Sequence, residues 1–247
     1  MNTPLSFFSE ESIARADIRF AREGFRYGFI ADVFQEGAFL NLVEHFPSVE
    51  KFKRVDKMSG GGRKRFFVGP EYASGKDDGC LCSFFGAENP WRLLAHEAAR
   101  PDFVGFFSGV MGVSFNSLCN FGLTFGNEGC VQEPHIDGAA REGDLSPVHS
   151  TWASIVYFNT DPNPVGGTCV YAPDRTTMLF SAPSMRNGLF FFEQHPAAWH
   201  GFPVMPKGAE RRILALSYSN EPRPIALRDS LSHKMTCKKF WKSMVRS

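Results

Sequence analysis

The chain has 247 residues, of which 43% are hydrophobic and 21% are charged, and its formal net charge is +1. A chain of this length can bury an ample core as a single domain, and its 26 phenylalanines exclude a disordered or fibrous protein. The near-neutral charge gives no basic field for nucleic acid or an acidic membrane surface, no apolar run is long enough to cross a bilayer, and the N-terminus lacks the pattern of a signal peptide. We therefore expect a cytoplasmic monomer or homodimer that has neither nucleic acid nor membrane as a partner.

The N-terminal part, residues 1–112, is expected to be a mainly helical support region. Apolar residues at near-helical spacing predict a helix over 30–46, which Pro47 ends. An asparagine cap followed by proline at 89–90 predicts a second helix that runs to about Met111.

The charged stretch 51–65 separates these two helices and contains Ser-Gly-Gly-Gly at 59–62. A phosphate-binding loop would continue with Gly-Lys and then Ser or Thr, which place a lysine on the phosphates, and that ending is absent here. We interpret the stretch as a surface loop.

Residues 113–220 differ in composition from the preceding part of the chain. They consist of short runs of β-branched and aromatic residues, which Gly, Pro and Asn separate. This sequence pattern predicts an antiparallel double-stranded β-helix, or jelly roll, with the N-terminal helices packed on one sheet. The predicted fold class is therefore α+β. The segment 159–167 is a turn within the jelly roll. The predicted strands cover 114–125, 131–136, 151–158, 167–172, 177–181, 188–193, 199–204 and 211–219.

The C-terminal segment, 221–247, carries seven basic and two acidic residues with apolar residues between them. It predicts a basic amphipathic helix, and we favour a solvated helix that caps the barrel or a partner subunit over a nucleic-acid arm.

The six cysteines stand at 80, 82, 119, 130, 169 and 237. They include no CxxC pair, and a core-rich chain of this size needs no disulfides, so free thiols are expected.

Two histidines and one aspartate are the candidate metal ligands of this sequence. His135 and Asp137 are two residues apart in the segment Pro-His-Ile-Asp-Gly, and in a strand such residues point to the same face. His200 lies in a short apolar segment that can form an opposing strand of the same barrel. Two histidines and a carboxylate are the facial triad that leaves three positions of an octahedral Fe(II) open.

Adjacent arginines begin the last predicted strand. An arginine that points into an apolar barrel needs an anion as its partner, and a dicarboxylate supplies one through bidentate pairing. Strand alternation sends Arg211 and Arg212 to opposite faces, so only one of them faces such a ligand. The bulkier apolar residues on the Arg212 face favour Arg212 as the residue that points inward.

Together these motifs resemble the non-haem Fe(II)- and 2-oxoglutarate-dependent dioxygenases, in particular the prolyl-hydroxylase-like branch that includes bacterial small-molecule hydroxylases. The resemblance covers about 112–220, through the motifs PHID, TWASIVYFNTDPNPVGGTCVY, WHGFPV and GAERRILALSY in the family's order. It implies that His135, Asp137 and His200 bind iron. The family's pattern of an arginine, two residues and then Leu or Ile implies that Arg211 binds the distal carboxylate of 2-oxoglutarate.

The resemblance also implies supporting residues, cofactors and an activity. Tyr157 and Asn120 stand where the family places further contacts to the cosubstrate. The implied cofactors are Fe(II), 2-oxoglutarate and O2, with ascorbate as a stimulant. The implied enzyme is an oxidoreductase that hydroxylates, desaturates or cyclises a small molecule such as an amino acid or a natural-product intermediate and releases succinate and CO2. Asp137 argues against halogenation, because halogenating relatives have a small residue there.

The substrate is the least determined part of this prediction. The polar segment 138–150 follows the metal motif and is expected to be a lid, in which Arg141 or His149 contacts the substrate. One alternative is a hydroxylase of a peptide or protein side chain. Another is a catalytically silent jelly-roll binding protein that keeps the barrel without the oxidation.

Overall fold

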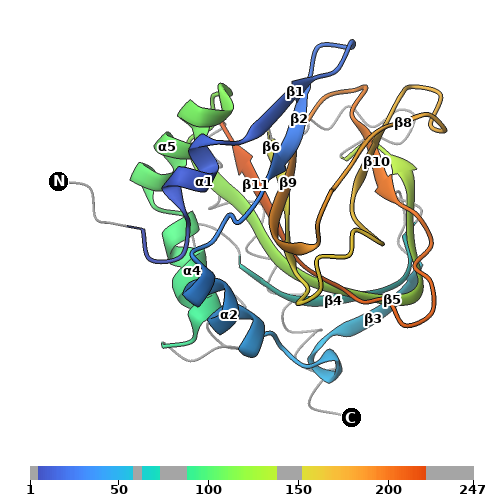
Figure 1. Cartoon of the computed structure of the whole chain (residues 1–247), viewed down its shortest axis with the longest axis horizontal. Helices are drawn as coiled ribbons and strands as arrows, with labels where there is room; N and C mark the ends of the chain where they lie inside the picture. The colour runs from blue at the N-terminus through green and yellow to red at the C-terminus, as the bar shows by residue number, and fades with distance from the viewer. Residues whose placement is uncertain (1–4, 58–62, 73–87, 138–151, 221–247) are drawn as a thin grey trace, which may run out of the picture.

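Antiparallel strands joined in one curled sheet form the core of the computed structural model, which describes residues 5–57, 63–72, 88–137 and 152–220 (Figure 1). The strands run β1 (Asp17–Phe20), β2 (Arg26–Ile30), β3 (Lys53–Lys57), β4 (Arg63–Tyr72), β5 (Ser117–His135), β6 (Trp152–Phe158), β7 (Cys169–Tyr171), β8 (Met178–Ser181), β9 (Arg186–Glu193), β10 (Trp199–Phe202) and β11 (Arg211–Ser219). The helices are α1 (Glu10–Ala14), α2 (Glu36–Glu44), α4 (Pro90–Ala98) and α5 (Pro101–Met111), with one 3-10 turn (Val49–Lys51).

The long strand β5 makes the sheet fold over on itself. The order is β1-β2-β9-β6-β11-β5-β10-β7-β8, and β5 pairs with β11 along its first part and with β10 at its end. The two edge strands then meet across the barrel, where the Arg19 guanidinium carbon on β1 lies 4.5 Å from the centre of the Phe180 ring on β8. This architecture confirms the predicted jelly-roll core.

The helices cover one face of the sheet and leave β8 and β10 on the opposite side of the molecule (Figure 1). Side chains from alternate positions of β6 and β11 fill the space beneath the helices. Phe158 is fully buried there, and its ring centre lies 4.7 Å from that of Trp91 on α4 and 6.2 Å from that of Phe39 on α2. The prediction that N-terminal helices pack on one sheet is therefore confirmed.

Both predicted helices exist, with shorter bounds than the sequence indicated. The first begins only at Glu36, because the chain runs through strand β2 to Ile30 and Asp32 then adopts φ 50°. The second begins as predicted, since the Asn89 side chain accepts a hydrogen bond of 3.0 Å from the Trp91 backbone. It divides before Pro101, because the residue that precedes a proline is held in an extended conformation.

The region 1–112 contains four strands, β1 to β4, besides its helices, and the sequence did not indicate these strands. The interpretation of 51–65 as a loop is wrong for its two ends, where β3 and β4 pair; positions 59–62 lie outside the described residues. Charged residues lowered the strand signal there, and in β3 they are typical of a strand at the edge of a sheet.

The eight strands predicted for 113–220 correspond to seven strands. The segments 114–125 and 131–136 belong to the single strand β5, which continues through a glycine at position 129 with φ 77°.

Several predictions fall outside the described residues, namely the lid at 138–150 and the basic helix at 221–247. Of the cysteines in the described part, 119, 130 and 169 are free thiols, as expected. Among the described residues, no helix has the length and hydropathy required to span a membrane.

Candidate active site

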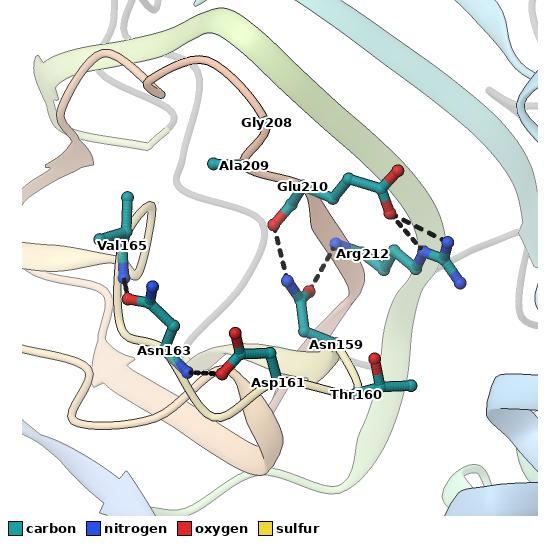
Figure 2. Close-up of a pocket in the computed structure, with 9 residues that line it drawn as sticks. All are labelled: Asn159, Thr160, Asp161, Asn163, Val165, Gly208, Ala209, Glu210 and Arg212. Carbon is teal, nitrogen blue, oxygen red and sulfur yellow. Dashed lines mark hydrogen bonds and ion pairs between the residues drawn. The ribbon is translucent and has the colours of Figure 1, made fainter.

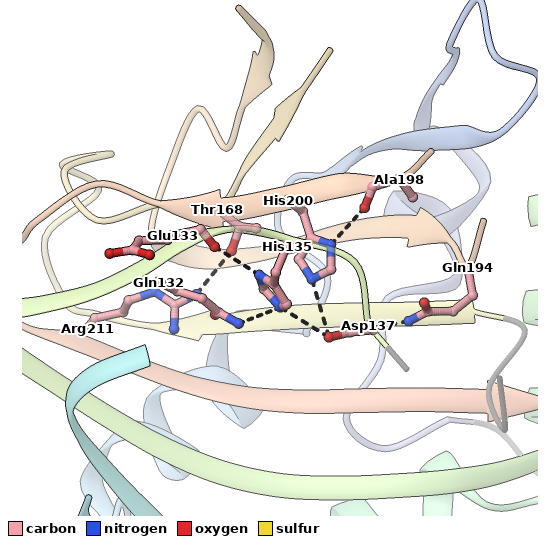
Figure 3. A network of polar contacts seen from close by, with 9 residues as sticks. All are labelled: Gln132, Glu133, His135, Asp137, Thr168, Gln194, Ala198, His200 and Arg211. Atoms are coloured by element: carbon pink, nitrogen blue, oxygen red, sulfur yellow. Dashed lines mark hydrogen bonds and ion pairs between the residues drawn. The ribbon is translucent and has the colours of Figure 1, made fainter. Parts of the chain in front are cut away.

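The three predicted metal ligands come together at the end of β5. His135 on β5 pairs directly with His200 on β10, and Asp137 follows two residues later (Figure 3). One ligand atom from each of the three residues lies within 4.8 Å of the other two. The Asp137 Oδ1 atom is 3.2 Å from His135 Nε2 and 3.5 Å from His200 Nε2. Ligands bound at about 2.1 Å and at right angles around one ion lie about 3 Å apart, so the spacing fits a facial triad.

Backbone carbonyls orient both imidazole rings for this role. His135 Nδ1 lies 3.0 Å from the carbonyl oxygen of Glu133, and His200 Nδ1 lies 2.9 Å from that of Ala198. An Nδ1 proton donated to a carbonyl leaves the lone pair on Nε2, which is the usual arrangement of a metal-binding histidine. The His200 side chain is 7% exposed and that of His135 11% exposed, so both rings are held in fixed positions. Nitrogen and oxygen donors of this kind suit Fe(II).

The two histidine side chains stabilise the charged form of the Asp137 carboxylate. Removal from water would raise the pKa of Asp137, but the neighbouring His200 and His135 side chains outweigh this effect and hold the pKa well below its usual value. Asp137 is therefore an anion at neutral pH, as a metal ligand must be. Gln194 Nε2 donates to the second oxygen, Asp137 Oδ2, at 3.2 Å and fixes the orientation of the carboxylate.

An irregularity in β5 sets the local geometry. Between the pairs His200–His135 and Phe202–Gln132, β5 contains one residue more than β10, which is a β-bulge. The bulge requires close backbone approach, because a Cβ atom at Gly201 would overlap the carbonyl oxygen of Gln132.

A second polar cluster surrounds Arg211, which is only 3% exposed. Its Nε donates to the carbonyl oxygen of Gly166 at 2.9 Å, and one terminal nitrogen donates to Thr168 Oγ1 at 3.0 Å. The guanidinium carbon lies 4.2 Å from the centre of the Phe202 ring, whose strand also carries His200. A buried guanidinium is the kind of group that pairs with a carboxylate.

Tyr157 belongs to the same cluster. Its hydroxyl donates to Thr168 Oγ1 and accepts from the Thr168 backbone, both at 2.8 Å. Burial raises the pKa of Tyr157, although the Arg211 charge acts to lower it, so the phenol stays protonated at neutral pH and can donate a hydrogen bond. The sequence did not indicate Thr168, because a threonine at the start of a predicted strand carries no signal of its own.

Arg212 points to the other face of β11 and lines a pocket between the turn at 159–165 and the start of β11 (Figure 2). It pairs with Glu210 at 2.9 Å, and its guanidinium carbon lies 5.8 Å from the Phe46 ring centre. The side chain of Asn159 accepts from the Arg212 backbone and donates to the carbonyl oxygen of Glu210. These contacts hold the start of β11 in place and leave Arg211, not Arg212, on the side of the barrel that holds the triad.

Asn120 also lies on the interior face of the sheet, which is the face that carries Arg211 and the triad. It does not lie beside Arg211. It pairs with Ser217, six residues along β11 from Arg211, which corresponds to about 20 Å of strand. Its assignment to the cosubstrate stays a prediction, and the structure does not bring it into the Arg211 cluster. Arg141 and His149, the expected substrate contacts, lie outside the described residues.

No model of a protein family matches the sequence, and no curated protein matches it. Solved structures do match. A Trichoplax adhaerens prolyl hydroxylase in complex with a peptide fragment of the hypoxia inducible factor oxygen degradation domain aligns with a TM-score of 0.58 at 15% identity, over 89% of this chain and 93% of that one. A Burkholderia pseudomallei oxidoreductase of the 2OG-Fe(II) oxygenase family gives a TM-score of 0.56 at 11% identity, over 79% and 86%.

A third structure, the non-haem α-ketoglutarate-dependent epimerase of nogalamycin biosynthesis, gives a TM-score of 0.53 at 15% identity, over 88% of this chain and 86% of that one. Most of each chain is covered, so the likeness concerns the whole fold and not one motif. The chain has the fold of the 2OG-Fe(II) oxygenases, and it carries a His-Asp-His group with the geometry of an iron-binding triad.

Proposed function

We propose that the protein is an Fe(II)- and 2-oxoglutarate-dependent oxygenase that oxidises a small molecule. The observation that carries this proposal is the convergence of His135 Nε2, Asp137 Oδ1 and His200 Nε2, with both Nδ1 atoms held by backbone carbonyls. In the overall reaction, the substrate, 2-oxoglutarate and O2 give hydroxylated product, succinate and CO2.

The residues of the chain divide this work between binding and orientation. His135, Asp137 and His200 would hold Fe(II), which supplies the activation of O2. Arg211 would bind the distal carboxylate of 2-oxoglutarate. The Tyr157 hydroxyl, which donates to Thr168 Oγ1 here, would turn its proton to the same carboxylate.

Aromatic side chains line the other side of the triad. The Phe192 ring centre lies 4.1 Å from that of His200, and Phe190 and Phe180 continue this apolar wall. Such a wall keeps water away from the reacting groups.

For the substrate we favour an amino acid or a natural-product intermediate, which is hydroxylated, desaturated or cyclised. Part of the interior face stays open, since Asn120, Ile155, Ala215 and Ser217 retain contact with solvent. Arg141 and His149 remain our candidates for substrate contacts. A peptide side chain is the second candidate, because the Trichoplax enzyme is in complex with a peptide fragment.

Conversion of 2-oxoglutarate to succinate tests the activity. Protein supplied with Fe(II), 2-oxoglutarate and air should form succinate, and a panel of free amino acids and short proline-containing or asparagine-containing peptides should show which class accelerates it. The matched control is His200→Ala, which should form none. Equal succinate from the wild type and the variant, or none from either, would favour the catalytically silent binding protein.

A further inference from the structure

Two uncharged polar side chains, Asn120 and Ser217, lie opposite each other on the interior face, and neither the triad nor the Arg211 cluster uses them. Asn120 on β5 pairs directly with Ser217 on β11, and the Cβ atoms of such a pair are about 5 Å apart. Both residues retain contact with solvent. In the part of the chain that the structure describes, neither side chain takes part in a hydrogen bond. Their donors and acceptors are therefore available to a ligand.

The strand register connects this pair with the triad. The pairs Asn120–Ser217, Ser217–Ala153 and Ala153–Phe192 form one row across β5, β11, β6 and β9, which are neighbours in the sheet (Figure 1). The ring centre of Phe192 lies 4.1 Å from that of His200. Only Ala153 stands between Phe192 and Ser217 in this row, and two strand spacings amount to about 10 Å. A small molecule can therefore reach from the polar pair to the triad.

The next row on the same face, one step closer to Arg211, is apolar. It consists of Gly122, Ala215, Ile155 and Phe190. Between β5 and β9, neither row contains a charged side chain. The charges in these rows lie at the far edge of the sheet, on β1, where Arg19 and Asp17 pair with each other at 2.8 Å.

The chemistry of this surface favours an uncharged group of the substrate. A free carboxylate or ammonium group taken out of water needs an opposite charge, which the two rows do not supply between β5 and β9. Arg211 lies six residues from Ser217 along β11, or about 20 Å of strand. An amide has a carbonyl acceptor and an N–H donor, and the Asn120 side chain offers the complementary donor and acceptor. The Ser217 hydroxyl can take either role.

We propose that Asn120 and Ser217 bind an amide group of the substrate, whose apolar part lies along Ile155 and Ala215. The inference rests on the proposed function and narrows its substrate class to molecules that carry an uncharged amide. Two sources share this chemistry, namely a small acylated or amidated amino acid and a peptide backbone. Asn120 is thereby assigned to the substrate and not to 2-oxoglutarate.

Calorimetric titration of the full chain, loaded with Mn²⁺ and 2-oxoglutarate under anaerobic conditions, measures substrate binding without turnover. The probes are leucine, proline and phenylalanine, each as the free amino acid, as the N-acetyl amide and in the middle of a capped tripeptide. At least one amide or tripeptide should bind, and about 10-fold more tightly than its free amino acid, because no charge has to be desolvated. Tighter binding of the N-acetyl amide would identify a small molecule as the source, and tighter binding of the tripeptide would identify a peptide.

Variants of the polar pair connect this preference with its residues. Asn120→Ala and Ser217→Ala should each weaken binding of the preferred amide by about 10-fold and leave the affinity for 2-oxoglutarate unchanged. Asn127→Ala, at an exposed position of the same strand, is the matched control and should bind the amide as the wild type does. Asn120→Asp is the second variant, in case Asn120→Ala does not fold. It keeps the shape of the side chain, loses the N–H donor, and should also weaken amide binding.

Three results would overturn the inference in a protein that binds Mn²⁺ and 2-oxoglutarate. They are binding of the free amino acids as tight as that of the amides, binding of none of the probes, and unchanged amide affinity in the folded variants of Asn120 and Ser217. Weaker binding of 2-oxoglutarate in Asn120→Ala would instead assign Asn120 to the cosubstrate and would also overturn it. If the wild type bound no Mn²⁺, the proposed function itself would fail and the inference with it.

Discussion

The two faces of strands β6 and β11 differ in nearly every physical respect, although their residues alternate along the same chain. On the helix-covered face, Phe158 and Leu214 are fully buried among aromatic rings. On the interior face, Tyr157 and Arg211 form a hydrogen-bonded polar cluster through Thr168. The first face holds large apolar groups in close contact, whereas the second carries charge, small side chains and solvent contact.

The adjacent arginines show what this difference means. Arg211 is buried and anchored, and Arg212, one residue later, forms a half-exposed ion pair with Glu210. In our proposal the same residue type would serve ligand binding on one face, whereas it supports local structure on the other. We expect substitutions on the interior face to impair binding at little cost in stability, and substitutions on the helix-covered face to do the reverse.

The largest effect is expected for the triad. His200→Ala should weaken Mn²⁺ binding by more than about 100-fold, because one of three ligand atoms is lost. The free energy of unfolding of the metal-free protein should change little, since no large apolar side chain is removed. Calorimetry and urea unfolding measure the two quantities, and His45→Ala, on the exposed end of α2, serves as the control. Full Mn²⁺ affinity in His200→Ala would show that the triad does not bind the metal.

Phe158→Ala tests the opposite face. Truncation of this fully buried ring should lower the free energy of unfolding by about 3–5 kcal/mol. At a temperature where the variant is folded, its Mn²⁺ affinity should equal that of the wild type. A loss below about 1 kcal/mol would show that the helices contribute little to stability.

The adjacent residues Arg211 and Arg212 allow the two faces to be compared within a single strand. Arg211→Ala should raise the KM for 2-oxoglutarate by about 10- to 100-fold, because a charge-assisted pair is lost. Arg212→Ala should leave that KM unchanged and lower the free energy of unfolding by no more than about 1 kcal/mol. The reverse pattern would show that Arg212 binds the cosubstrate.

The smallest effect is expected at the helix cap. Asn89→Ala removes the side-chain acceptor for the Trp91 backbone and should lower the free energy of unfolding by about 1 kcal/mol. Thermal unfolding measures it, and Asn89→Ser should restore most of the loss. Equal stability of all three proteins would mean that the cap is replaced by water.

The sequence was most informative where its pattern was regular. The strands of the barrel have clear apolar alternation, and the triad residues lie at the spacing that one strand face requires, so both could be predicted. Strands β1 and β3 could not, because charged residues such as Arg54 mask the alternation in these short edge strands.

Contacts that depend on long-range geometry were not predictable either. Gln132 reaches His135 only through a bulge, and bulges leave little trace in a single sequence. Thr168 reaches Arg211 across 43 residues of chain, and only the closed barrel brings them together. The choice between Arg211 and Arg212 depended on a register that alternation alone leaves open.

Anaerobic titration with Fe(II) and 2-oxoglutarate tests the central claim, that the interior face binds both together. The wild-type protein should develop a weak visible absorption that requires both ligands and saturates at one Fe(II) per chain, and neither His200→Ala nor His135→Ala should develop it. Absence of this absorption from the wild type, or equal absorption in the variants, would contradict the account.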